Sequence, residues 1–248
     1  MSAAVSFDDV SKRFVLRHER AYTVLESVIG LVKPARRTTE EFWALRAVSF
    51  EIPDGETFGI IGPNGAGKST VLKLMSRILE PTSGQVAVKG RISPLLELGA
   101  GFHPELTGRE NVYLNAALFG VSQAEAQDRY DEIVEFSELR DFIDVPMKHY
   151  SSGMYMRLGF AVAANIIPDV LLVDEVLAVG DEAFQRKCLR KIEKFRREGR
   201  AIVFVSHDLD TVRRICHRAL WLGQGEVRAL GTANVVVERY LESMARAP

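Results

Sequence analysis

The chain has 248 residues, of which 47% are hydrophobic and 26% are charged, and this length suits one α/β domain with a full core. Its 32 basic and 33 acidic residues nearly balance, which excludes a global electrostatic attraction to nucleic acid or to acidic lipid. Any partner must therefore be recognised locally, and we expect no nucleic acid among the partners.

The first residues have neither the basic start nor the apolar core of a signal peptide. The most apolar stretch, residues 158–179, is interrupted by polar and charged residues, so it cannot span a bilayer as one helix. We expect the chain to stay in the cytosol. A role in transport would then require a separate membrane subunit.

We expect two strands at Val5–Phe7 and Val48–Ile52, with an insertion between them at residues 15–42. Pro34 ends a run of apolar residues at helical spacing and precedes a basic pair. These residues are Tyr22, Leu25, Val28, Ile29 and Val32, followed by Arg36 and Arg37. The pattern predicts a short amphipathic helix and a basic loop. A surface helix folded back on its own domain is the alternative.

A glycine-rich loop follows the apolar run Phe58–Ile61 and precedes a helical pattern. Its glycines let successive N–H groups point at phosphate oxygens, and the helix adds the positive end of its dipole. Lys68 would reach the β- and γ-phosphates, and Ser69 would ligate Mg²⁺. The predicted nucleotide-binding residues are Gly62, Asn64, Gly65, Ala66, Gly67, Lys68, Ser69 and Thr70. ATP or GTP is the ligand that this loop predicts.

Two Ser/Thr-x-x-Glu patterns, at Thr107–Glu110 and Ser122–Glu125, predict capping boxes at the starts of two helices. The region from there to about residue 165 is predicted to be helical. Beyond it, the apolar strand Val170–Val173 leads into Asp174 and Glu175.

A buried parallel strand that ends in two acids delivers carboxylates to a site at its C-terminal end. Asp174 would hold Mg²⁺ through water, and Glu175 would polarise the attacking water. A plain core strand ending in solvated acids is the alternative. Together with the glycine-rich loop, the acids indicate a P-loop NTPase.

The segment Tyr150–Leu158 precedes an apolar helix. A serine hydroxyl and backbone N–H groups at a helix start form a second phosphate-binding surface, although a simple helix N-cap is the alternative. The segment resembles the Leu-Ser-Gly-Gly-Gln signature of ABC transporter ATPases. Ser151 and Gly153 match its serine and second glycine, whereas three positions depart from it, namely Tyr150, Ser152 and Met154.

The resemblance implies further roles for individual residues. Asp181 matches the D-loop aspartate, and His207 matches the histidine that positions the γ-phosphate and the water. Glu97 is the best-aligned substitute for the Q-loop glutamine, where a carboxylate could reach Mg²⁺ or its water. Phe14 is the best-placed residue to stack on adenine, with Tyr22 and Trp43 as alternatives. In this family two chains sandwich two nucleotides.

Residues 96–111, together with the altered signature, resemble the ATPase subunits of polysaccharide and teichoic acid exporters. The resemblance implies ATP and Mg²⁺, a second copy of the chain, a multi-span membrane permease, and a lipid-linked polysaccharide cargo carried by that permease. It also implies a location at the cytoplasmic face of the bacterial cytoplasmic membrane, with the N-terminal helix on the membrane side. An importer ATPase and a non-transport ABC ATPase are the alternatives.

The predicted fold class is α/β, a P-loop NTPase (RecA-like) core with an N-terminal antiparallel β layer and an inserted α-helical subdomain. We expect one ABC nucleotide-binding domain over residues 1–248, with the β layer and core at 1–105 and 166–248 and the helical subdomain at 106–165. Later strands are predicted at 201–205 and 220–222. A hairpin turn at Gly223–Gly225 and a helix at 232–244 follow.

Overall fold

The computed structural model describes residues 3–17, 39–95, 99, 101–166, 168–173 and 180–245. Three groups of sequence predictions lie outside these residues. They are the amphipathic helix with the basic pair after it, Glu97, and the acidic pair Asp174 and Glu175. They remain predictions.

Six strands form the larger sheet, in the order β5-β6-β7-β3-β8-β9. They are β3 (Thr57–Ile61), β5 (Ile92–Pro94), β6 (Val170–Val173), β7 (Ala201–Val205), β8 (Arg218–Gly223) and β9 (Glu226–Thr232). All pair in parallel except β9, which joins β8 in antiparallel. β3, β6 and β7 are buried along their whole length, which explains their continuous apolar runs.

A second, antiparallel sheet has the order β2-β1-β4, with β1 (Ala3–Arg17), β2 (Thr39–Pro53) and β4 (Ser83–Val88). Its first two strands are longer than the sequence predicted and extend into both ends of the predicted insertion. Register shifts within β1, between Phe7 and Lys12, interrupt the alternation of side chains. A period-two pattern therefore identifies only short pieces of each strand.

The two sheets pack together through a column of three phenylalanine rings. Phe7 and Phe50 stack with centroids 4.6 Å apart, and Phe50 and Phe58 stack at 5.6 Å. These residues belong to a buried cluster that also includes Leu72 and Met75 of α2 (Lys68–Met75). The cluster ties the antiparallel sheet to β3, the strand that ends in the glycine-rich loop.

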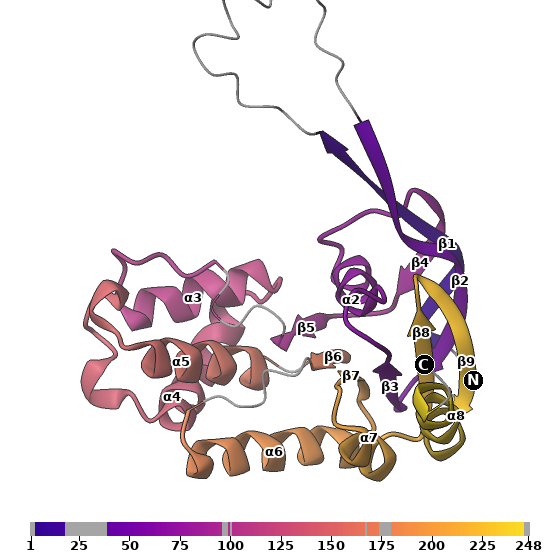
Figure 1. Ribbon diagram of the computed structural model, residues 1–248. Helices are drawn as coiled ribbons and strands as arrows, with labels where there is room; N and C mark the ends of the chain where they lie inside the picture. The colour runs from indigo at the N-terminus through magenta and orange to yellow at the C-terminus, as the bar shows by residue number, and fades with distance from the viewer. Residues whose placement is uncertain are drawn as a thin grey trace, which may run out of the picture.

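Helices cover the other face of the larger sheet. They are α5 (Ser152–Asn165), α6 (Glu182–Arg197), α7 (Leu209–Ile215) and α8 (Ala233–Ala245), and each contributes to a second buried cluster. In Figure 1, α6 runs along the bottom of the molecule, and α7 and α8 lie near its right-hand end.

A third cluster belongs to a helical group made of α3 (Gly108–Leu118), α4 (Gln123–Ser137), α5 and the 3-10 turns Arg140–Phe142 and Met147–His149. Figure 1 shows these helices gathered on the left, away from the antiparallel sheet on the right. Phe136 of α4, Phe160 of α5 and Phe184 of α6 pack ring against ring, with centroids 5.8–6.3 Å apart. The predicted α/β core with a β layer and a helical subdomain is confirmed.

The two predicted capping boxes differ. At Thr107 the box is complete, because its hydroxyl accepts from the Glu110 N–H and the Glu110 carboxylate accepts from the Thr107 N–H at 2.8 Å. Ser122 also caps its helix by accepting from the Glu125 N–H. The prediction that the Glu125 carboxylate accepts in return from the Ser122 N–H is wrong. The Glu125 carboxylate instead accepts two hydrogen bonds from Arg91, which lowers its pKa and ties α4 to the start of β5.

Candidate functional site

The glycine-rich loop connects the buried strand β3 to α2, as predicted. Two of its glycines have no room for a side chain. Gly62 has φ 145° and a Cβ there would collide with the carbonyl oxygen of Leu222, while Gly67 has φ 104° and its Cβ would lie 2.7 Å from the carbonyl oxygen of Ala44. The loop backbone therefore lies pressed between β2 and the end of β8, and only glycine permits this approach.

The β8–β9 turn holds the loop from outside. Gln224 and Gly225 both have positive φ, 54° and 79°, the conformation that a two-residue hairpin favours. The Gly225 N–H donates to the Ala66 carbonyl at 3.1 Å, and the Gly225 carbonyl accepts from the Arg46 N–H at 2.8 Å. The loop is thus clamped by two segments that are far from it in sequence.

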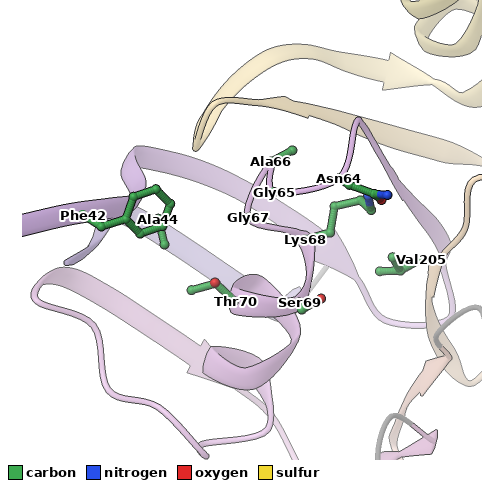
Figure 2. A pocket seen from close by; sticks show the side chains of 10 residues that line it. All are labelled: Phe42, Ala44, Asn64, Gly65, Ala66, Gly67, Lys68, Ser69, Thr70 and Val205. Atoms are coloured by element: carbon green, nitrogen blue, oxygen red, sulfur yellow. The ribbon is translucent and has the colours of Figure 1, made fainter. Parts of the chain in front are cut away.

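A cavity of about 290 Å³ opens beside this loop. Figure 2 shows Phe42 and Ala44 of β2 on one side and the loop leading into α2 on the other. The lining residues are Phe42, Ala44, Asn64, Gly65, Ala66, Gly67, Lys68, Ser69, Thr70 and Val205. Seven of the eight residues predicted for phosphate binding therefore line one cavity, and Gly62 opens the same loop.

Lys68 is nearly buried, and its ammonium lies inside the loop. Its Nζ donates to the carbonyl oxygens of Gly62 at 2.8 Å and Pro63 at 3.1 Å. Ser69 follows as the second residue of α2, so its hydroxyl sits at the positive end of the helix. A cation and the N–H groups at the start of a helix, around one cavity, fit a polyphosphate.

The strand order brings the C-terminal ends of β3, β6 and β7 to one edge of the sheet. β6 and β7 are parallel neighbours, and β7 is also the parallel neighbour of β3. Their C-terminal ends therefore lie on the edge where β3 enters the glycine-rich loop. Asp174 and Glu175 follow β6 directly in the sequence, and Val205 at the end of β7 lines the cavity.

His207 lies between β7 and α7, two residues beyond Val205, and is exposed. The residues on either side of it are well anchored. The Ser206 hydroxyl accepts from the Asp208 N–H at 2.9 Å, and Asp208 caps α7 by accepting from the N–H groups of Asp210 and Thr211. The Thr211 hydroxyl and these N–H groups hold the pKa of Asp208 below its usual range. The backbone that presents His207 is thus held on its C-terminal side.

Ser151, Gly153 and Asp181 do not line the cavity of their own chain. Ser151 is the N-cap of α5, and its hydroxyl accepts from the Met154 N–H at 3.2 Å. It is therefore a helix cap as well as a candidate for phosphate contact. A Cβ added to Gly153 would have only the Ser151 hydroxyl within 4 Å, at 3.9 Å. The start of α5 therefore presents an exposed serine beside an uncrowded glycine.

Asp181 caps α6 by accepting from the Phe184 N–H at 2.9 Å, and it forms an ion pair with Arg157 at 2.6 Å. The hydrogen bond from the Phe184 N–H has the largest effect in lowering the pKa of this carboxyl, and the positive charge of Arg157 lowers it further. In its own chain Asp181 is therefore a helix cap as well as a candidate for nucleotide contact.

Phe42 is an aromatic residue of the cavity that the sequence analysis did not name. It is 51% exposed, and Phe14 lies opposite it in the β1–β2 register. The guanidinium carbons of Arg13 and Arg46 lie 5.7 and 5.8 Å from the ring centroid of Trp43. The spacing of Phe42 and Ala44 could have indicated this role, because residues two apart on a strand share one face. Tyr22 lies outside the described residues.

A family model described as ABC transporter matches residues 45–178. The chain belongs to the ABC transporter family. ATP binding and hydrolysis are accordingly the activities of this ABC ATPase. The helices that the structure describes include none of the length and apolarity needed to cross a bilayer.

Similar curated proteins include the O-antigen export system ATP-binding protein RfbB of Klebsiella pneumoniae, 44% identical over 99% of this chain and 100% of that protein. RfbB of Myxococcus xanthus is 48% identical, over 98% of this chain but only 57% of the relative. The teichoic acids export ATP-binding protein TagH of Listeria monocytogenes is 43% identical, over 96% of this chain and 70% of TagH.

Among solved structures, the ATP-binding subunit of an ABC transporter has a TM-score of 0.74 at 24% identity, covering 96% of this chain and 93% of that one. A dimeric ATP-binding cassette with ADP and Pi has a TM-score of 0.70, also at 24% identity, covering 92% and 98%. These likenesses confirm the P-loop NTPase fold.

The aromatic wall of the cavity yields a direct prediction. We expect Phe42→Ala to weaken ATP binding by about 1–2 kcal/mol, because a half-exposed ring beside the cavity is available to stack on a base. We expect a smaller loss for Phe14→Ala, since Phe14 is not among the lining residues. Titration with a fluorescent ATP analogue checks both. Equal affinity for wild type and Phe42→Ala, with the fold intact, would exclude Phe42.

Proposed function

We propose that this ABC ATPase drives the movement of a lipid-linked cell-surface polysaccharide or teichoic acid out across the bacterial cytoplasmic membrane. It acts at the cytoplasmic face, as a homodimer bound to a multi-span permease that carries the cargo. The observation that carries the homodimer in this proposal is the division of the nucleotide-binding candidates. One set lines the cavity, whereas Ser151 and Gly153 lie at an exposed helix start outside it.

This division has a physical consequence. A serine and a glycine at an exposed helix start form a phosphate-binding surface, but the cavity of the same chain is lined by other residues. A second copy related by twofold symmetry can supply the missing phosphate. The surface of each chain then covers the nucleotide of the other, and the two contacts are equivalent. Asp181, at the start of α6, would approach the same interface.

Within each site, Mg²⁺ would be held by Ser69, Asp174 and Glu97, a donor set of hard oxygens that suits this ion. The ion supplies neutralisation of phosphate charge when bound. Glu175 would polarise the attacking water, and His207 would position that water and the γ-phosphate. Lys68 and the loop N–H groups hold the phosphates, and Phe42 or Phe14 stacks on the adenine.

The direction of transport and the cargo class are supported by the named relatives, which are O-antigen and teichoic acid export proteins. Residues of this chain point the same way. The signature lacks its leucine, its first glycine and its glutamine, and the region around Glu97 contains no glutamine. An importer ATPase is expected to keep these consensus residues.

The catalytic assignment predicts a separation of binding from turnover. We expect Glu175→Gln to bind ATP nearly as well as wild type and to lose about 100-fold in kcat, the scale of a lost acid-base group. Nucleotide titration and phosphate release measure the two properties. Unchanged turnover would remove Glu175 from this role.

The sandwich predicts complementation between two inactive variants. Lys68→Ala damages the loop, and Gly153→Asp places a carboxylate at the second phosphate surface, where the glycine is uncrowded. Half of randomly mixed dimers contain both variants, and one of their two sites is intact. We therefore expect the mixture to recover up to about one quarter of wild-type activity. No recovery, in a mixture that does form mixed dimers, would contradict the sandwich.

The predicted amphipathic helix provides a test of the link to the membrane. Asp at both Leu25 and Ile29 would remove its apolar face, which we propose contacts the permease or the bilayer interface, with Arg36 and Arg37 available to lipid phosphates. We expect export to be lost while ATPase activity and thermal stability of the isolated protein stay near wild type. Unfolding of the double variant would instead assign the helix to the core.

A further inference from the structure

Arg157 occupies a junction between three elements. It lies in α5, six residues after Ser151. Its Nη1 donates to Glu138 at the end of α4 at 2.9 Å, and its Nη2 donates to Asp181 at the start of α6 at 2.6 Å. Its guanidinium carbon lies 4.9 Å from the ring centroid of Phe184. The side chain is only 20% exposed.

Both acidic partners are themselves held in place. The second oxygen of Glu138 accepts from Lys187 of α6 at 3.0 Å, and the second oxygen of Asp181 accepts from the Phe184 N–H. Glu138 ends α4 with a left-handed φ of 59°. Each carboxylate thus has one oxygen for Arg157 and another fixed elsewhere, which gives the junction a single geometry. An isolated surface ion pair lacks this constraint.

The backbone next to Asp181 also approaches Arg157 closely. Gly180 has φ 71°, and a Cβ at this position would lie 3.3 Å from Arg157 Nε. A side chain is therefore disfavoured here both by conformation and by space. Arg157 consequently holds Gly180 and Asp181, which directly follow residues 174–179 in the sequence.

We propose that Arg157 is a positioning residue that locks the start of α5 and the start of α6 into one unit, which each chain presents to the nucleotide of the other. The inference rests on the proposed sandwich. Arg157 is absent from the lining of its own chain's cavity, so it does not contribute to initial ATP binding. Its loss instead lets Asp181 and the Ser151 surface move independently, which lowers the rate of the assembled site.

The planar fork of arginine is essential to this role. A guanidinium can donate to Glu138 and Asp181 in two fixed directions, whereas a lysine ammonium is a point charge on a flexible stem. Arg157→Lys keeps the charge but loses the fixed geometry of the two hydrogen bonds. Arg157→Gln loses both. Arg186→Gln is a matched control, because Arg186 is an exposed arginine of α6 whose ion pair, within the described part of the chain, is with Glu182 of its own helix.

The test measures kcat, KM for ATP, monomer ATP affinity and urea unfolding for these three variants in the full chain with Mg²⁺. We expect Arg157→Gln to lose about 10-fold or more in kcat, with Arg157→Lys between it and wild type. KM and monomer ATP affinity should stay within about twofold. Glu138→Gln, which breaks one arm only, should lose less than Arg157→Gln. Arg186→Gln should match wild type throughout.

Several outcomes would overturn the inference. These are wild-type kcat in a folded Arg157→Gln, or a loss that appears in KM and ATP affinity rather than in kcat. Unfolding of Arg157→Lys as well as Arg157→Gln would make Arg157 a determinant of stability alone. No recovery of activity in mixed dimers of Lys68→Ala and Gly153→Asp would instead refute the proposed sandwich, so the two failures are distinguishable.

Discussion

The close approach of three backbone segments determines the nucleotide site. The loop between β3 and α2 lies against the Ala44 carbonyl of β2 and against the β8–β9 turn, which donates from Gly225 to Ala66. These contacts are between main-chain atoms, so they specify distance more tightly than side-chain packing does. The phenylalanine column from Phe7 to Phe58 supports them by holding the two sheets together. The cavity exists where these constraints meet.

Parallel strand order then determines what can reach this cavity. Because β6, β7 and β3 run in the same direction side by side, their C-terminal ends lie at one edge of the sheet. The start of α5 lies outside the lining of the cavity, which is why we propose that a second copy of the chain completes the nucleotide site.

Charged residues of α6 connect the helical group to the core. Lys187 donates to the Phe136 carbonyl near the end of α4 at 2.9 Å, where the helix dipole favours a cation. Lys191 pairs with Glu132 of α4 and donates to the Asn165 side chain at the end of α5 at 2.6 Å. Together with the packed rings of Phe136, Phe160 and Phe184, these contacts hold the helical group on α6. They place α5 relative to Asp181.

The sequence by itself determined the features encoded in a few consecutive residues. The glycine-rich loop, the complete capping box at Thr107, the hairpin turn and the buried strands all follow from local conformation and hydrogen bonding. Tertiary structure alone decided which distant residues meet. Phe42 lines the cavity because β2 lies against the glycine-rich loop, Glu125 turns from its cap to Arg91, and Arg157 reaches Asp181. Register and long-range ion pairs depend on how separate elements pack, which local spacing does not encode.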